Sequence, residues 1–593
     1  MEERAAVGGG GEVEAAYTKD GSVDLKGRPV LRSKTGGWKA ASFIVVYEMV
    51  ERLAFYGIAT NLIVYLTTQL HQGTVAAANN VTNWVGTVWM TPILGAYIAD
   101  AHLGRFWTFV IASIIYLSGM VLVTLSVSIP SLKPPSCQNQ DSGCRAGSLQ
   151  VAVFMVGLYI VAVGTGGTKP NISTMGADQF DDFEPKERKQ KLSFFNWWMF
   201  SIFFSTIFAN SFLVYIQDNV GWALGYGIPT IGLILAILVF FVGSPLYRHQ
   251  RTSDSPFAKM AKVIVAAFRK RMVPLPTDLH ELQEEEYAKS GQFQEHFVSV
   301  PCTQDWGRFL NKAAVRVGPS TAWTLCTVTQ VEETKQMIKM FTIFLASFIP
   351  NTITAQGHTL FIKQGTTLDR SLGPHFKIPP ASLTSFVNIS MLISLAIYDK
   401  WFVPLARKYT NNPRGITMLQ RLGAGLILHI IIMVISALVE KERLSFVGHH
   451  GLEHSKDAIP LTIFILLPQF VLVGVADALV EVAKLEFFYD QAPATMKSLG
   501  TSYFTSCVGL GNFLSSFILK TVAKVTSHGG RKGWITNNAN MSRLDYYYGL
   551  LAAISAVNFI YFLFASRLYK YRAEPSELDV ELQKPCEPRT NKT

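Results

Sequence analysis

Three charged side chains lie where the surrounding sequence is apolar. Glu48, Glu51 and Arg52 belong to a stretch from about residue 40 to 66 that is long enough to span a bilayer. A charge at the bilayer centre costs on the order of 2.5–3.5 kcal/mol on insertion scales, and such charges usually mark a functional site. On a helix the three residues are spaced i, i+3 and i+4, so they share one face. That face must contact protein or water, and a buried ion pair that only fixes helix packing is the alternative.

Lys169 is a further charge inside an apolar segment. It follows a glycine-rich run, residues 164–167, and precedes Pro170. Glycines allow helices to approach closely, and a proline distorts the end of a helix. The run is not a phosphate-binding loop, because the GxxxxGK[ST] spacing is missing. An intramembrane site cation and a lysine that reaches water from a helix end both fit this pattern.

A later apolar segment contains Asp477, Glu481 and Lys484. Asp477 and Glu481 are one helical turn apart, and the spacing of Glu481 and Lys484 allows an ion pair. Asp477 lies deepest among apolar neighbours, so we predict that it is an acid exposed to an internal cavity.

These charged groups suggest a proton-coupled mechanism. A low-dielectric cavity favours the protonated form of a carboxyl group, and a nearby cation favours the ionised form. A solute carboxylate would compete with an acid for Lys169 or Arg52, and the released acid would then take a proton. The membrane potential adds about 2.3 kcal/mol for each positive charge moved across 100 mV.

The composition indicates one polytopic membrane protein rather than several soluble domains. The chain has 593 residues, of which 49% are hydrophobic and only 16% are charged, whereas soluble proteins carry about 25% charged residues. The net charge is +11, but Lys and Arg cluster between apolar segments, so membrane topology explains them better than nucleic acid does. The six cysteines form no CxxC pair, so a structural metal site is not expected. No hydrolytic constellation is present, and we expect neither an enzyme nor a cofactor.

The apolar segments fall into two groups separated by a polar region. We predict an all-α membrane protein with twelve transmembrane helices in two six-helix halves, the major facilitator arrangement. The predicted parts are a cytosolic tail (1–37), an N-terminal half (38–243), a cytosolic linker with an amphipathic helix (244–335), a C-terminal half (336–566) and a second cytosolic tail (567–593). The amphipathic helix is expected near the inner membrane face.

Several longer motifs are specific to one family. The chain contains EMVER, GAYIADAHLGR, GTGGTKPNISTMGADQF, SFFNWWMFS, NPRGITMLQRLG and LEFFYDQAPATMKSLGTS. With these motifs it resembles a plant member of the proton-dependent oligopeptide transporter family, in the branch that mixes nitrate and peptide transporters. The resemblance extends from about residue 17 to 572, and it is strongest to the peptide-transporter-like members.

The resemblance implies roles for the charged residues. Glu48, Glu51 and Arg52 would serve proton coupling. Lys169 would hold the substrate carboxylate and interact with that charged set. Asp477 falls where the family usually has a Glu that meets the amino group of a peptide.

Further site residues complete this prediction. We predict Tyr56, Gln356 and Glu481 as substrate-binding residues. A gating loop would contain Asp100 and Arg105. No residue is predicted to bind a metal.

Four positions depart from the patterns of the family. Ala59 replaces an Arg of the bacterial members, and Phe203 replaces an Asn of their fifth span. Ala355 replaces a Glu of their seventh span, which weakens the prediction of peptide specificity. Thr354 stands where the founding nitrate transporter has a nitrate-binding His, so nitrate ranks below peptide.

Three regulatory or covalent features are also predicted. Thr108 matches a phosphorylated threonine of the founding nitrate transporter, which makes a regulatory kinase a candidate partner. Cys137 and Cys144 share a loop expected outside the cell. They could form a disulfide there or remain two free thiols, and the sequence does not decide between these alternatives. Asn540 begins an acceptor sequon for N-glycosylation on the same side.

We therefore predict a symporter of protons and small nitrogenous solutes, with di- and tripeptides first. Nitrate and plant hormones or other organic anions are rival substrates, and a transporter-like nutrient sensor is the rival of another class. We expect a multi-pass protein of the plasma membrane, with the vacuolar membrane as the alternative and both termini cytosolic. Its partners would be protons, the solute and the lipid bilayer, with no nucleic acid and no indicated oligomeric state.

Overall fold

The computed structural model describes residues 17–133, 146–250, 255–275, 307–317, 321, 323–410, 415–455, 458–528, 533–569 and 571. Cys137 and Cys144 lie outside these residues, so their pairing stays a prediction. The chain divides into two compact units. Unit 1 comprises residues 1–253, 345–485 and 504–561, and unit 2 comprises residues 254–344, 486–503 and 562–593.

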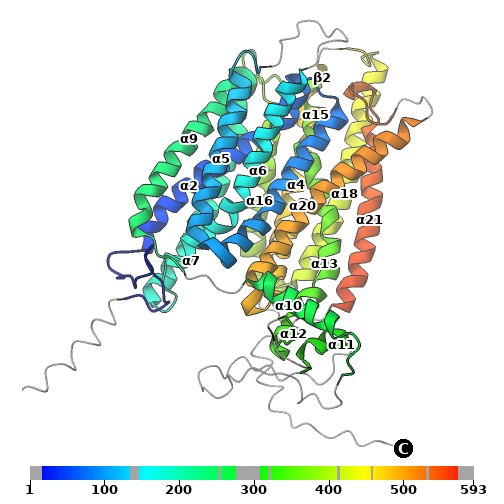
Figure 1. Cartoon of the computed structure of the whole chain (residues 1–593). Helices are drawn as coiled ribbons and strands as arrows, with labels where there is room; N and C mark the ends of the chain where they lie inside the picture. The colour runs from blue at the N-terminus through cyan, green and yellow to red at the C-terminus, as the bar shows by residue number, and fades with distance from the viewer. Residues whose placement is uncertain are drawn as a thin grey trace, which may run out of the picture. The chain divides into compact units, whose positions relative to one another are not determined.

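The described chain is almost entirely helical (Figure 1). The N-terminal helices are α2 (Gly37–Ala59), α3 (Leu62–Thr68), α4 (Thr74–Ile98), α5 (Gly104–Ser128), α6 (Ser148–Ala177), α7 (Pro185–Phe208), α8 (Val214–Asn219) and α9 (Trp222–Gly243). The C-terminal helices are α13 (Phe341–Ala346), α14 (Phe348–Thr354), α15 (Leu360–Gly365), α16 (Thr384–Ile397), α17 (Val403–Thr410), α18 (Met418–His449), α19 (Leu467–Gln491), α20 (Lys497–Thr526) and α21 (Leu544–Leu568). Strands β1 (Leu368–Asp369) and β2 (Ile459–Thr462) form one short parallel pair.

Eleven helical segments of the described chain are long and apolar enough to cross a membrane. One of them, Thr74–Ser128, has 55 residues and contains both α4 and α5. Each of these helices has 25 residues, enough for one crossing. Gly104 at their junction has a φ of +73°, a left-handed conformation that glycine adopts readily. Counting α4 and α5 separately gives the twelve spans that the sequence predicts.

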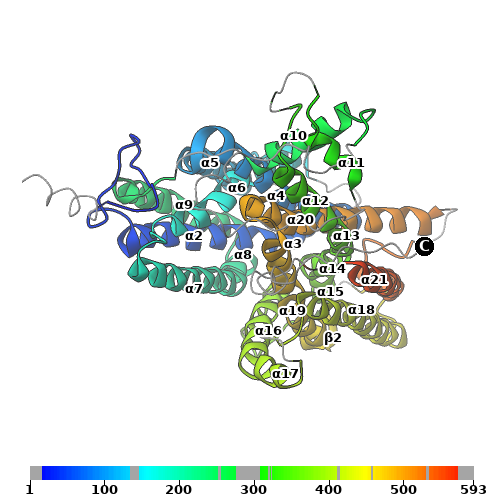
Figure 2. The same ribbon diagram turned by 90° about the horizontal axis from the view of Figure 1, so that it is seen from below.

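Glycines bring α6 into close contact with its neighbours. Helix α6 packs along α4 and α5, and α2 packs against α7 and α9 (Figure 2). A Cβ atom added at Gly164 would lie 2.5 Å from the backbone of Tyr116 on α5, and one at Gly95 on α4 would collide with the backbone of Gly166. The predicted close approach at the glycine-rich run is therefore confirmed.

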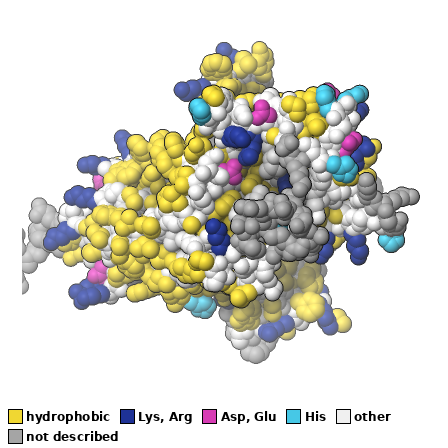
Figure 3. Space-filling model, turned by 90° about the horizontal axis from the view of Figure 1, so that it is seen from above, with side chains coloured by type: hydrophobic (Ala, Val, Ile, Leu, Met, Phe, Trp, Pro, Cys, Tyr) yellow, Lys and Arg dark blue, Asp and Glu magenta, His cyan; other side chains and the backbone are white. Residues whose placement is uncertain are grey.

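The outer surface of the N-terminal helices is apolar. Trp197, Phe200 and Phe204 on α7 and Ile231 and Leu235 on α9 are all exposed. Figure 3 shows hydrophobic side chains covering a broad part of the face that it displays. A patch of this extent would be a liability in water but is what contact with lipid requires.

Contacts between the N-terminal and C-terminal helices of unit 1 are concentrated at one end. Hydrogen bonds join them at four residue pairs: Thr74 with Asn537, Asn79 with Ser516, Ser211 with Ser385, and Asp218 with Arg370. These pairs lie toward the end at which α4 begins. Farther along α4, a Cβ atom added at Gly86 would lie 3.1 Å from the carbonyl oxygen of Gly509 on α20. The Phe513 side chain lies 2.9 Å from the same added Cβ position, so α4 and α20 pack closely there.

Part of the predicted N-terminal tail is folded against unit 1. Residues 17–36 form isolated bridges, and Val23 pairs with His249 through the backbone. The Arg32 guanidinium binds Asp181 and Glu184, and the buried Arg248 binds Glu187. The buried acids after α6 explain why this polar stretch packs, because its arginine and backbone groups satisfy them.

Unit 2 contains the predicted amphipathic helix. Helix α10 (Pro256–Arg269) buries Val263, Ala266 and Ala267 against α11 (Arg308–Asn311) and α12 (Val328–Lys339). Its apolar face is therefore partly covered by protein. Ile264 and Phe268 remain exposed beside this small core.

We expect the strap formed by residues 17–36 to stabilise unit 1 in a pH-dependent way. Burial favours a raised pKa for Asp181, but hydrogen bonds from the Lys19 and Phe183 amides and the Arg32 guanidinium together lower it below the ordinary value. This contribution is present above the unfolded-state pKa and is lost as pH falls through the folded-state pKa. Asp181→Asn should therefore cost about 1–3 kcal/mol at pH 7, and the difference from wild type should vanish in acid.

Thermal unfolding of the purified protein at a series of pH values measures this effect. The neighbouring Asp182→Asn is the control, because the Asp182 side chain is 58% exposed and should change the Tm little. Equal melting temperatures for Asp181→Asn and wild type at every pH would contradict the assignment.

Candidate functional site

Helix α2 places the three predicted charges on one buried face. Glu48, Glu51 and Arg52 are 3%, 1% and 5% exposed. The Arg52 Nε atom lies 3.1 Å from Glu48 Oε1, and Arg52 Nη2 pairs with Glu51 Oε2. The shared helix face predicted from the i, i+3 and i+4 spacing is confirmed. Helix α2 packs against α6, α7 and α9, so this face contacts protein.

The three charges depend on one another. Apart from the ion pairs with Arg52, Glu48 Oε2 and both carboxylate oxygens of Glu51 are buried and make no hydrogen bond to other described residues. One arginine balances one of the two acids, so the group carries a net charge of −1 when both are ionised. Protonation of either acid would leave a one-to-one ion pair, and this residual charge makes the group suitable for binding a proton.

Lys169 on α6 has a different environment. Its Nζ atom is buried and has no hydrogen-bond partner among the residues that the structure describes. It lies 2.9 Å from the centroid of the Trp89 ring on α4. The alternative of a lysine reaching water does not fit this burial. The sequence reasoning did not identify Trp89, because one tryptophan in an apolar helix carries no signal of its own.

The C-terminal helices bring together the second charged group. Asp477 on α19 is 7% exposed, and the Thr354 hydroxyl donates a hydrogen bond to its carboxylate at 3.2 Å. The Lys484 ammonium lies 2.6 Å from Glu481 Oε1, which confirms the predicted ion pair. Lys484 also lies 5.2 Å above the Phe504 ring on α20. The carboxylate of Asp477 makes no ion pair within the described part of the chain.

The other two predicted substrate residues are placed differently. Tyr56 on α2 is half-buried and contacts Phe55 edge to face. The Gln356 side chain is buried, and its amide nitrogen donates to the Thr352 carbonyl and the Ser515 hydroxyl. Both hydrogen bonds of this side-chain nitrogen are therefore made to other C-terminal residues.

The predicted gating loop has a partner that the sequence reasoning missed. Arg105 pairs with Asp178, the residue that follows α6. Asp178 was part of a recognised motif, GADQF, but nothing in its spacing indicated Arg105 as the partner. Asp100 lies in the short π-helical segment Ala99–Leu103 that joins α4 to α5. Thr108 is only 6% exposed in α5, so a kinase would reach its hydroxyl only after a local opening.

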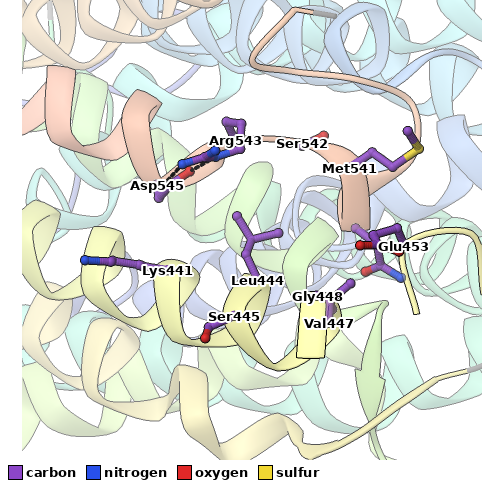
Figure 4. A pocket seen from close by; sticks show the side chains of 11 residues that line it. Lys441, Leu444, Ser445, Val447, Gly448, Glu453, Met541, Ser542, Arg543 and Asp545 are labelled. Atoms are coloured by element: carbon purple, nitrogen blue, oxygen red, sulfur yellow. Dashed lines mark hydrogen bonds and ion pairs between the residues drawn. The ribbon is translucent and has the colours of Figure 1, made fainter. Parts of the chain in front are cut away.

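A separate pocket of about 350 Å³ lies between the C-terminal end of α18 and the segment before α21. Figure 4 shows the Arg543–Asp545 ion pair across from Lys441 and Leu444. Asn540 at this pocket is 7% exposed.

The predicted sequon at Asn540 is wrong for this fold. Arg443 donates to the side-chain oxygen Oδ1 of Asn540 at 2.8 Å, and the side-chain nitrogen Nδ2 of Asn540 donates to the Leu452 carbonyl at 3.4 Å. A glycan could not be attached to an amide buried in this way. Among the described residues, no group of three or more His, Cys, Asp or Glu side chains is arranged to hold a metal ion.

Comparisons with known proteins agree with this architecture. The sequence model of the POT family matches residues 106–535. The chain is 58% identical to the Arabidopsis thaliana protein NRT1/PTR family 5.2 over 572 residues, which cover 95% of this chain and 97% of that protein. It is 57% identical to NRT1/PTR family 5.3 of the same plant, with 97% of this chain and 98% of that protein covered.

Solved structures share the fold. The crystal structure of an auto-inhibited POT family peptide transporter matches with a TM-score of 0.65 and 18% identity, over 90% of this chain and 98% of that one. The in meso crystal structure of the POT family transporter PepTSo matches with a TM-score of 0.65 and 20% identity, over 92% and 99% of the two chains. These likenesses confirm the predicted all-helical transporter fold.

We expect Arg52→Met to destabilise the protein more than Lys484→Met does. Loss of Arg52 leaves two buried carboxylates without a cation, which costs about 3–5 kcal/mol. Loss of Lys484 leaves Glu481, whose side chain is 21% exposed and can recruit water. The Tm of each purified variant measures the difference, and an equal or larger loss in Lys484→Met would contradict the pairing described for α2.

Proposed function

The chain belongs to the POT family of proton-coupled transporters, and we propose that it symports protons with di- and tripeptides by alternating access. The observation that carries this proposal is a pair of opposite charges without ionic partners in the described residues. Lys169 is a buried cation without an anion, and Asp477 is a buried acid without a cation. A peptide has one carboxylate and one ammonium, so it could satisfy both.

The net charge of the site supports proton coupling. Four acids (Glu48, Glu51, Asp477 and Glu481) and three cations (Arg52, Lys169 and Lys484) belong to the charged groups. When all are ionised the sum is −1, because four negative charges meet three positive ones. A zwitterionic peptide leaves this sum unchanged, and one proton brings it to zero. Charge neutrality favours movement through a low-dielectric protein.

The proton would bind within the α2 group. A solute carboxylate on Lys169 removes a positive charge from the field at Glu48 and Glu51, which favours protonation of one acid. The other acid keeps its ion pair with Arg52. Opening to the opposite side would expose the acid to a less acidic solution, where the proton and the peptide leave together. Tyr56 and Glu481 would line the solute path.

A small anion such as nitrate is the second candidate. Lys169 alone provides a cation without an acidic partner, and nitrate or an organic anion such as a plant hormone would bind there. Asp477 favours the peptide, because an uncompensated acid repels a simple anion. A nutrient sensor without flux would not need titratable groups in both sets of helices.

The multi-pass protein would act in the plasma membrane, with both termini in the cytosol. The vacuolar membrane is the alternative location. Positive charges between the spans support this orientation. Asp100 and Arg105 would then lie on the cytosolic side, where the Arg105–Asp178 pair would help gate the release of solute.

At mildly acidic external pH, we expect the addition of a dipeptide to evoke an inward current in oocytes that express the protein. Glu48→Gln should abolish proton-driven uptake but retain peptide exchange, because exchange needs no net proton transfer. Glu442→Gln is the control, since Glu442 is exposed on α18. Voltage clamp and labelled dipeptide uptake measure both.

Surface expression must be equal in all variants. Current with nitrate but not with dipeptide would favour the anion candidate. No current with any solute would favour the sensor. Unchanged uptake by Glu48→Gln would mean that the charged residues of α2 only stabilise helix packing and do not couple protons.

A further inference from the structure

Trp89 contacts both sets of transmembrane helices. One contact is with Lys169, whose ammonium lies 2.9 Å from the centre of the indole ring. The other is with Phe504 on α20, where the ring centroids are 6.4 Å apart and the planes meet at 79°. Trp89 and Phe504 therefore form an edge-to-face pair between α4 and α20.

Phe504 also contacts a lysine, Lys484, which belongs to the C-terminal helices. The Lys484 ammonium lies 5.2 Å from the centre of the Phe504 ring. The four side chains thus form a continuous row, Lys169–Trp89–Phe504–Lys484, which we call the aromatic bridge. It connects the lysine of one charged group to the lysine of the other.

The two lysines differ in what else holds them. Lys484 has a carboxylate, Glu481, at 2.6 Å. Lys169 has only the ring, and its ammonium makes no hydrogen bond to the described residues. An aromatic face attracts a cation through its quadrupole, but a carboxylate attracts it more strongly. The ring therefore gives the Lys169 ammonium a contact that an arriving anion can replace.

We propose that Trp89 is a positioning residue for Lys169 and that the aromatic bridge links the occupancy of Lys169 to the contact between α4 and α20. An arriving carboxylate draws the ammonium off the indole face. The indole then loses a partner, and its contact with Phe504 changes with it. This inference rests on the proposed function only in taking the arriving anion to be the carboxylate of the solute.

A double-mutant cycle tests the contact without any solute. Trp89→Leu should lower the Tm of the purified full-length protein more in the wild-type background than in the Lys169→Met background, so the two changes should not be additive. Trp89→Phe should retain part of the coupling, because a phenyl ring is a weaker cation partner than an indole. Trp107→Leu is the control, since Trp107 is exposed on α5 and should show no coupling to Lys169. Additive losses for Trp89 and Lys169 would overturn the proposal.

Transport measurements test the role in the cycle. Trp89→Leu should raise the KM for dipeptide about tenfold, and Trp89→Phe should raise it less. Phe504→Leu should lower the maximal rate more than it changes KM, because the Phe504 ring contacts Trp89 and Lys484 and not Lys169, where the carboxylate arrives. Equal KM values for wild type and Trp89→Leu would overturn the positioning role. A wild type that carries no dipeptide current would refute the proposed substrate. The double-mutant cycle of Tm values would then be the test of whether Trp89 positions Lys169.

Discussion

A charge inside a membrane has only protein groups as partners. In the described helices of unit 1, some of the buried charges lack a full counter-charge. Arg52 is shared by Glu48 and Glu51, so one acid always lacks a full counter-charge. Lys169 lies against an aromatic ring instead of an acid. A protein selected only for stability would pair these groups or replace them with apolar side chains. In the function proposed above, these incompletely paired charges are the groups to which a proton and a solute bind.

The sequence predicted features that depend on local spacing. A helix fixes which residues share a face, so the cluster of Glu48, Glu51 and Arg52 and the pair of Glu481 and Lys484 followed from counting residues. The close approach at the α6 glycines followed for the same reason, since glycine runs in membrane helices have few other uses. The family motifs supplied the fold, which the solved structures share.

Features that depend on how separate helices meet were not predictable from spacing. Trp89 and Phe504 are more than 400 positions apart, and each resembles many other aromatic residues of the chain. Asp178, which follows α6, binds Arg105 at the start of α5, 73 positions earlier in the chain. The side-chain nitrogen of Gln356 donates to Thr352 and Ser515, and neither partner was indicated by the sequence. In each case the partner is chosen by tertiary packing, which a single sequence does not encode in any local pattern.

The contact of Gly86 with Gly509 has a mechanical consequence. A Cβ atom added at Gly509 would lie 2.6 Å from the Met90 side chain and 3.0 Å from the Gly86 carbonyl oxygen. Neither glycine can therefore be replaced by a larger residue unless α4 and α20 move apart. The absence of two side chains sets how closely the N-terminal and C-terminal helices approach at this point.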